Sequence, residues 1–296
     1  MCLWYDTGIM KWQGRRQSGN VEDRRRMGGR GIAVGGGLGG VVLIVLYLLL
    51  GGDPATLVQS LQGGTSTEIT SGTGADRELT AHQKEMGDFV SVVLADTEDI
   101  WGARFKEMGR TYRQPKLVLF TGQVESSCGA AGASVGPFYC PGDEKVYIDL
   151  DYFEDMQKEL NAQGDFALAY VIAHEVGHHV QTLFGIDDKV RSLRAQASEA
   201  QANALSVRME LQADFLAGVW AHYARKTQDY IDTADIEEAL NAASAVGDDR
   251  IMKQTRGYVV PDAFTHGTSE QRVRWFRKGL ETGDMEQGDT FRASKL

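Results

Sequence analysis

The stretch AYVIAHEVGHHVQ, residues 169–181, contains the pattern His174-Glu-Val-Gly-His178. It lies within a predicted helix over residues 165–184. Histidines four residues apart share one face of a helix, so His174 and His178 can bind the same metal ion. Glu175 lies about 100° around the helix from His174, close enough to take a proton from a water molecule that the metal activates. The pattern therefore predicts a zinc site with Glu175 as the general base.

A third ligand is expected elsewhere, because catalytic zinc takes three protein ligands and leaves the fourth position open. A later helical stretch carries Glu210-Leu-Gln-Ala-Asp214 among apolar residues that indicate a buried segment. Glu210 and Asp214 lie one turn apart on one helix face. We expect Glu210 to bind the metal and Asp214 to accept a hydrogen bond from a ligand histidine, which fixes its tautomer. The alternative is that both carboxylates only solvate the helix.

Apolar periodicity along the rest of the chain predicts mainly helices and a few strands. The expected helices cover residues 77–109, 165–184, 189–225, 235–246 and 268–280. The expected strands cover residues 116–121 and 145–150, with a short third strand near Phe138. The last helix opens with Thr268-Ser-Glu-Gln271, which fits a capping box. Because helices dominate and the strands cluster early, the predicted class is α+β with a small β-sheet.

The amino-terminal tenth of the chain is basic, and an apolar segment follows it. Residues 1–30 contain seven Lys and Arg and three acidic residues, a local charge of +4; since the whole chain carries −10, residues 31–296 carry −14. Ile32 to Leu50 is free of charge and would span about 28 Å as a helix, enough to cross a bilayer core. The pattern predicts an uncleaved transmembrane anchor over residues 31–52. A cleaved signal peptide is the alternative.

This anchor sets the expected organisation of the chain. Residues 1–30 would form a cytoplasmic basic tail, and residues 53–76, rich in Gly, Ser and Thr, a flexible linker. Residues 77–296 would form the catalytic domain, on the periplasmic or extracellular side of the cell (inner) membrane. The acidic character of this domain argues against nucleic acid as a partner.

The cysteines provide a second indication of export. Cys128 and Cys140 lie in a turn-rich stretch with eleven residues between them. In an exported domain such a pair is expected to form a disulfide bond, which would stabilise the fold by about 2 to 3 kcal/mol. A pair of buried thiols is the alternative.

The motifs His174–His178 and Glu210–Asp214 together resemble those of the gluzincins, in which HExxH is followed at a distance by ExxxD. More closely, the chain resembles the bacterial neutral zinc metallopeptidases, also called the YpfJ family. Six stretches within residues 10–290 carry this resemblance: MKWQGRR, NVEDRR, VGPFYCPGDEKVYIDL, AYVIAHEVGHHVQ, ELQADFLAGVWA and HGTSEQRVRWFRKG. The resemblance implies a zincin-like peptidase fold, a zinc ion, and a peptide or unfolded protein as substrate. It begins at Met10, so residues 1–9 lie outside the pattern.

Gluzincin-like hydrolysis also needs a donor to the oxyanion that develops on the substrate, commonly a His or Tyr. His266 is the first candidate and Tyr258 the second; a loop histidine without function is the alternative for His266. By resemblance to other zincins, the strand at 145–150 would be the edge strand that takes an extended peptide. His179 points about 100° away from His178 and is expected to pack or to support the site. Two other histidines are expected to be structural: His82 and His222.

These features predict a mainly helical, zincin-like metalloprotease domain that follows a single transmembrane helix. The predicted function is a zinc-dependent endopeptidase at the cell membrane. Two alternatives remain. The first is a non-catalytic, zinc-stabilised scaffold or binding domain at the cell envelope, whose metal site would be closed by a fourth protein ligand. The second is an amidase that acts on a peptidoglycan cross-link with the same metal chemistry.

Overall fold

A central helix carries the His-Glu-x-x-His pattern. In the computed structural model, which describes residues 10–26, 78–132, 136–151, 165–228 and 231–296, this helix is α5 (Asp165–Leu183). It begins with an acidic residue, which favours the positive end of the helix dipole. Gly185 follows its end with a φ of 70°, a left-handed conformation that favours glycine. Most side chains from Phe166 to Gln181 are buried, as expected for a helix at the centre of a domain.

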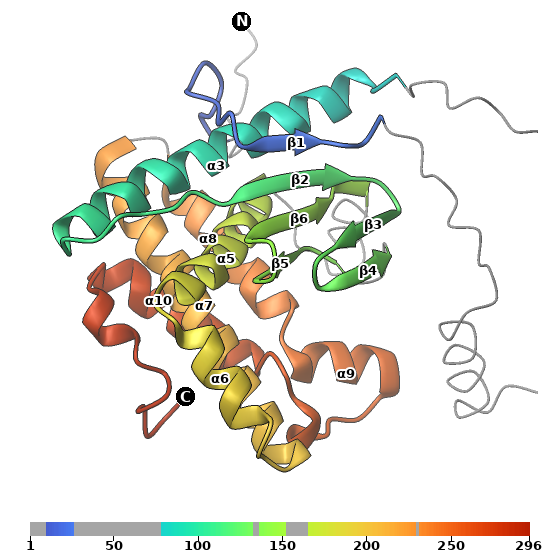
Figure 1. The fold of residues 1–296 in the computed structure, drawn as a ribbon, viewed down its shortest axis with the longest axis vertical. Helices are drawn as coiled ribbons and strands as arrows, with labels where there is room; N and C mark the ends of the chain where they lie inside the picture. Colours follow the sequence, from blue (N-terminus) through green and yellow to red (C-terminus); the bar gives the residue numbers. More distant parts are fainter. Residues whose placement is uncertain (1–9, 27–77, 133–135, 152–164, 229–230) are drawn as a thin grey trace, which may run out of the picture. The chain divides into compact units, whose positions relative to one another are not determined.

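A four-stranded sheet covers part of this helix (Figure 1). Its strands, in spatial order, are β1 (Val21–Asp23), β2 (Lys116–Phe120), β6 (Lys145–Asp149) and β5 (Phe138–Cys140). The first three run parallel, whereas β5 runs antiparallel to β6 and forms an edge. β6 is therefore an interior strand. The expectation that the strand at 145–150 forms the edge is wrong, because a third short strand pairs with its outer side.

Side chains on the two faces of the sheet enter different cores, as the two-residue period of a strand requires. Leu119 and Ile148, which are paired in register, belong to the main core with α3 (Ala81–Glu107) and α5. Val118 and Tyr147 face the other way, into a smaller cluster. A separate antiparallel hairpin covers that second cluster: β3 (Gln123–Ser126) and β4 (Gly129–Gly132).

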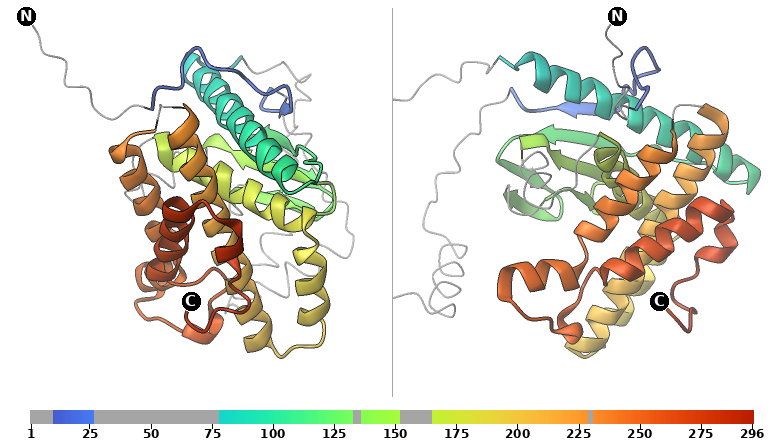
Figure 2. Two further views of the ribbon diagram at one scale, coloured as in Figure 1. Left: turned by 90° about the vertical axis from the view of Figure 1, so that its left-hand side faces the viewer. Right: turned by 180° about the vertical axis from the view of Figure 1, so that it is seen from behind.

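The remaining described helices lie after α5 in the chain: α6 (Ile186–Arg194), α7 (Glu199–Gln228), α8 (Thr233–Ala245), α9 (Asp248–Arg256) and α10 (Ser269–Thr282), with the short 3-10 turns η2 (Pro261–Ala263) and η3 (Met285–Gly288). The predicted stretch 189–225 is two helices, separated at residues 195–198. The capping box at Thr268 is present. Figure 2 shows α7 and α10 side by side. The predicted α+β class with a small sheet is thus confirmed, and α9 is an addition.

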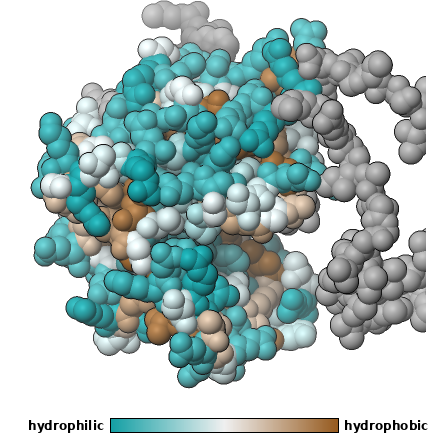
Figure 3. Space-filling view, in the orientation of Figure 1, coloured by the Kyte–Doolittle hydropathy of each residue, from teal (hydrophilic) through white to brown (hydrophobic). Residues whose placement is uncertain are grey.

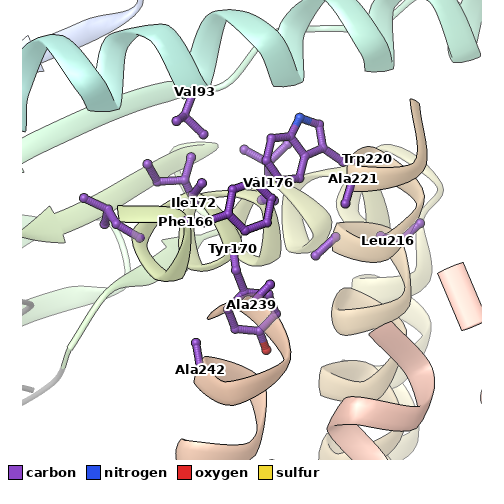
Figure 4. Packing of buried hydrophobic residues seen from close by; sticks show 14 of the residues in the cluster. Val93, Phe166, Tyr170, Ile172, Val176, Leu216, Trp220, Ala221, Ala239 and Ala242 are labelled. Atoms are coloured by element: carbon purple, nitrogen blue, oxygen red, sulfur yellow. The ribbon is translucent and has the colours of Figure 1, made fainter. Parts of the chain in front are cut away.

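The largest buried cluster surrounds α5. Figure 4 shows side chains of α5 that lie between Val93 of α3 on one side and residues of α7 and α8 on the other. Phe166 of α5 stacks on Trp220 of α7, with ring centroids 5.8 Å apart. Both side chains are fully buried, and burial of a side chain such as Phe166 contributes about 1.5–3 kcal/mol. This packing fixes α5 and α7 relative to each other, and these two helices carry the predicted metal ligands.

The amino-terminal segment, residues 10–25, is part of the same folded unit as the chain from Leu79 onward. β1 pairs with β2, and Trp12 is buried with its ring 5.6 Å from that of Phe89. Arg16 forms ion pairs with Glu98 and a neighbouring aspartate of α3. This differs from the predicted boundary, which assigns residues 1–30 to a tail outside the domain. Several basic residues of this segment pair with acidic residues within the fold.

The predicted anchor at residues 31–52 and the linker at 53–76 lie outside the described residues. Within the described ranges, no helix combines the length and the apolar character that a membrane span needs.

Candidate functional site

Close packing of α5 against α7 brings the three expected metal ligands together. A Cβ atom at Gly177 would lie 3.0 Å from the carbonyl oxygen of Ala213, so a larger residue would push the helices apart by a few tenths of an ångström. His174 Nε2 lies 3.1 Å from Glu210 Oε2, and His178 Nε2 lies 3.5 Å from Glu210 Oε1. One ligand atom from each of the three residues lies within 4.8 Å of the other two. The two sequence motifs, although distant along the chain, thus bring their three side chains together around one point.

This group of residues fits a zinc ion. Two imidazole nitrogens and one carboxylate oxygen are a common ligand set of catalytic zinc. Among the described residues, the group around this point has three members: His174, His178 and Glu210. The other ring nitrogen of each histidine, Nδ1, already has a partner. His174 Nδ1 lies 2.8 Å from Asp214 Oδ1, and His178 Nδ1 lies 2.9 Å from Gln181 Oε1. Both rings therefore turn Nε2 toward Glu210, as a shared metal ion requires.

Asp214 is the centre of a buried hydrogen-bond network. It is fully buried and accepts bonds from His174 Nδ1, from the Tyr170 hydroxyl at 2.6 Å, and from Arg272 at 2.8 and 2.9 Å. Because a carboxylate can only accept, His174 carries its proton on Nδ1. The Arg272 guanidinium balances the charge of Asp214, which would otherwise be costly to bury. The role expected for Asp214 thus matches the geometry around it.

Sequence reasoning missed Arg272 and Tyr170, although a signal for Arg272 was present. The buried positions of α10 are Arg272, Trp275, Phe276 and Gly279, which follow the spacing of an apolar helical stripe. An arginine on such a stripe indicates a buried carboxylate partner. The sequence did not identify this partner, because it depends on how closely α10 approaches α7. Gly279 allows this approach, since a Cβ atom there would lie 2.1 Å from the Phe215 carbonyl oxygen.

The charges around the site are strongly coupled. Burial lowers the pKa of His174, but the charge and hydrogen bond of Asp214 outweigh burial and raise it to about 10. The pKa of His178 is likewise raised, because the charge of Glu210 outweighs burial. Burial would raise the pKa of Glu210 and Asp214, but the neighbouring positive groups hold both well below their ordinary values. Two ionised carboxylates therefore favour positive charge at this point, which a divalent cation would supply.

The site opens into a cavity of about 560 Å³. Glu175, which is only 7% exposed, lines this cavity together with the three expected ligands. Phe138 and Tyr139 of the edge strand β5 also line the cavity, as does Ile251 of α9. Figure 3 shows apolar surface in a hollow between the strand-bearing and α9-bearing parts of this face. The cavity therefore joins the predicted catalytic base to β5, which among the described strands pairs with β6 alone.

His266 also lines the cavity, and Asp248 holds it there. Asp248 Oδ1 lies 3.1 Å from His266 Nδ1, while Oδ2 accepts the backbone N–H groups of Thr265, His266 and Gly267. The hydrogen bond from Asp248 raises the pKa of His266, against the effect of burial. A protonated imidazole could donate to a developing oxyanion. Asp248 was not expected from the sequence.

The other residues considered from the sequence lie elsewhere. Tyr258 is 62% exposed, and His222 bonds to the Leu280 carbonyl oxygen at 2.7 Å. Neither is among the described residues that line the cavity. The structure therefore provides no support for Tyr258 as the second oxyanion donor, and it leaves His222 outside the site, as expected.

His179 supports the wall of the cavity. It is fully buried, and its Nε2 lies 2.6 Å from the Arg113 carbonyl oxygen, which can only accept. Nδ1 is therefore unprotonated and accepts the Tyr139 hydroxyl at 3.1 Å. Burial lowers the pKa of His179, which keeps the ring neutral. His179 thus holds β5 against α5, in line with the expected supporting role.

A disulfide bond joins Cys128 to Cys140, as predicted. Cys140 ends β5 and is fully buried, whereas Cys128 lies in the turn between β3 and β4. The bond therefore fastens the edge strand, a wall of the cavity, to the neighbouring hairpin.

Comparison with known proteins supports the assignment of these motifs. The family described as "Putative neutral zinc metallopeptidase" matches residues 10–291. The chain is 51% identical over 288 residues to the "Uncharacterized protein YpfJ" of Escherichia coli (strain K12), which covers 95% of this chain and 99% of that protein. It is 40% identical over 266 residues to the "Uncharacterized protein Rv2575" of Mycobacterium tuberculosis (strain H37Rv), covering 84% and 86% respectively.

No solved structure matches the chain. The family assignment therefore rests on sequence similarity, which extends over both metal-ligand motifs and nearly all of the described fold. The chain belongs to the neutral zinc metallopeptidase family.

Proposed function

We propose that this chain is a zinc-dependent endopeptidase whose metal is held by His174, His178 and Glu210. The observation that carries the proposal is the three-residue ligand set next to Glu175, in a cavity bounded by β5, the edge strand of the described sheet. A zinc ion held there would acidify a water molecule and polarise a peptide carbonyl. The test is cleavage of an unfolded protein by the purified zinc-loaded chain, with Glu175→Gln as the matched variant.

The surrounding residues supply the proton transfers that peptide hydrolysis needs. Glu175 accepts a proton from the attacking water and passes it to the leaving amine. His266, whose protonated form Asp248 favours, donates a hydrogen bond to the carbonyl oxygen as negative charge develops. Asp214 accepts the Nδ1 proton of His174 and so holds the ring in the correct tautomer, while Arg272 donates to Asp214 and keeps that carboxylate in place.

The substrate is proposed to be an extended peptide segment that pairs with the free edge of β5. This replaces the predicted docking strand, since β6 has neighbours on both sides. Peptide addition to a strand edge uses backbone hydrogen bonds, so it selects flexible or unfolded segments and depends only weakly on side chains. His179 and the disulfide both hold β5 in place for this purpose.

A non-catalytic zinc scaffold is the second candidate function. Such a site would be closed by a fourth protein ligand. The three-member ligand set and the cavity beside it favour the enzyme instead. An amidase that cleaves peptidoglycan cross-links would use the same metal chemistry, and cleavage assays with both substrate types distinguish it from an endopeptidase.

We also propose that the protein is attached to a membrane, with residues 10–26 and the catalytic domain on the same side of it. The orientation predicted from sequence puts residues 1–30 in the cytoplasm and the catalytic domain outside. The pairing of β1 with β2 and the burial of Trp12 instead favour both flanks of the apolar segment on the same side.

Cysteine labelling tests this orientation. In a Cys2→Ser background, a single new cysteine at exposed Gln13 or at exposed Ser198 is treated with a membrane-impermeant maleimide on intact spheroplasts. We expect the two positions to behave alike, either both labelled or both protected until the membrane is permeabilised. Labelling of one position and protection of the other would restore the single-pass topology.

The pH dependence of cleavage tests the role of His266. Because the hydrogen bond to Asp248 raises the pKa of His266, the protonated ring persists to higher pH than in a free histidine and is lost as pH rises above that pKa. The alkaline limb of kcat/KM should therefore move to lower pH in Asp248→Asn, because the carboxylate that raises the pKa of His266 is lost. Asp262→Asn, an exposed control, should leave the limb in place. An unmoved limb in Asp248→Asn would remove His266 from the mechanism.

A further inference from the structure

A chain of hydrogen bonds leads from His178 into the protein core. His178 Nδ1 lies 2.9 Å from Gln181 Oε1, and Gln181 Nε2 lies 3.0 Å from Gln212 Oε1. Gln212 Nε2 then lies 2.9 Å from the carbonyl oxygen of Gly288, which ends η3. Gln181 is fully buried and Gln212 is 8% exposed, so water does not readily replace these bonds.

Backbone carbonyl groups fix the direction of this chain. Since the Gly288 carbonyl can only accept, Gln212 must turn its amide nitrogen toward Gly288 and its oxygen toward Gln181. Gln181 Nε2 also donates to the Met209 carbonyl oxygen at 2.8 Å, so the Gln181 oxygen faces the histidine ring. An amide oxygen only accepts. His178 therefore carries its proton on Nδ1, and its Nε2 has the free lone pair that a metal ion requires.

The far end of the chain is held firmly in place. A Cβ atom at Gly288 would lie 2.4 Å from the Phe215 ring, so only glycine allows this approach of η3 to α7. The Thr290 hydroxyl donates to the Arg208 carbonyl oxygen at 2.6 Å, and the Arg208 guanidinium donates to the Thr290 carbonyl oxygen. The carboxyl-terminal segment thus presents a fixed acceptor to Gln212.

We propose that Gln181 and Gln212 are positioning residues that lock the tautomer and ring orientation of His178 for metal binding. The proposal rests on the zinc site of the proposed function. It adds a role for Gln181 and Gln212, which are not among the expected metal ligands or catalytic residues. It makes Gln181 the counterpart, at His178, of Asp214 at His174. Removing such a partner of a metal ligand commonly weakens metal binding about 10- to 100-fold.

The test measures zinc affinity, so it does not depend on catalysis. Gln181→Met keeps the side-chain volume but removes the acceptor, and we expect its zinc dissociation constant, measured against a competing chelator, to rise about 10- to 100-fold. Gln212→Met, which does not touch His178, should give a smaller rise. Gln196→Met, at an exposed position before α7, is the matched control and should bind zinc like the wild type.

A second measurement is made on the wild-type protein, so it does not depend on whether a variant folds. Nitrogen-15 shifts of the His178 ring in the wild-type protein should show protonated Nδ1 with and without zinc, whereas Gln212→Met should show a mixture of tautomers without zinc. A wild-type ring protonated on Nε2, or a folded Gln181→Met variant that binds zinc within twofold of the wild type, would overturn the proposal. A protein that binds zinc as expected but cleaves nothing would contradict the proposed function and leave this inference standing.

Discussion

Replacement of Glu175 by glutamine should abolish proteolysis and leave zinc binding intact. Glutamine has nearly the same shape but cannot accept the proton of the attacking water, and loss of a general base commonly costs about 10²–10⁴-fold in rate. Glu175 is not one of the three grouped ligands, so the zinc content should stay at that of the wild type. The measurement is kcat/KM for an unfolded protein substrate, with metal analysis of the same samples.

The matched control is Glu199→Gln, which changes the same residue type at an exposed position of α7. It should retain both zinc and activity. If Glu175→Gln cleaves the substrate within tenfold of the wild-type rate at equal zinc content, Glu175 is not the general base. Loss of zinc together with activity would show instead that Glu175 helps to hold the metal.

Replacement of Glu210 by alanine should have the largest effect on the metal. Glu210 lies between the two histidines and contributes the only carboxylate of the grouped ligands. Its loss removes a ligand and leaves the positive charges of the site less balanced. We therefore expect the zinc dissociation constant to rise by more than the 10- to 100-fold that is typical of outer partners such as Asp214.

Glu199→Ala is the control for this variant, because it lies on the same helix and its side chain is exposed. Zinc affinity should be unchanged there. Thermal unfolding of both variants in chelator separates a loss of metal from a loss of fold. Equal zinc retention in Glu210→Ala and Glu199→Ala would refute Glu210 as the third ligand.

The sequence predicted local features of this fold well. Apolar periodicity identified α3, α5 and α8, and the capping box marked the start of α10, because these signals depend on residues within one or two turns. The HExxH spacing identified His174 and His178 for the same reason. Glu210 and Asp214 were found because their own spacing places them on one face of a buried helix.

Features that depend on distant contacts were missed or misassigned. β1 has three residues, two of them charged, and it forms only because β2 offers a partner almost a hundred residues later. The interior position of β6 depends on the pairing of β5 along its outer side. The bond between Arg272 and Asp214 depends on how closely α10 approaches α7. No local pattern specifies these contacts.

The basic amino-terminal residues are a further example of contacts that no local pattern specifies. Their excess charge suggested a cytoplasmic flank, as the positive-inside rule would have it. In the structure Arg16 pairs with Glu98, and Arg25 pairs with Asp23 and donates to the Gln83 carbonyl oxygen. Part of this charge therefore stabilises the packing of the amino-terminal segment on α3.

Stepwise return of zinc to the chelated protein tests the central claim most directly. Cleavage of an unfolded protein is followed as zinc is added, and bound metal is counted in the same samples. The account predicts that activity is absent without metal, rises in proportion to bound zinc, and is complete at about one ion per chain. Full cleavage by the metal-free protein, or one bound zinc per chain with no cleavage, would contradict it.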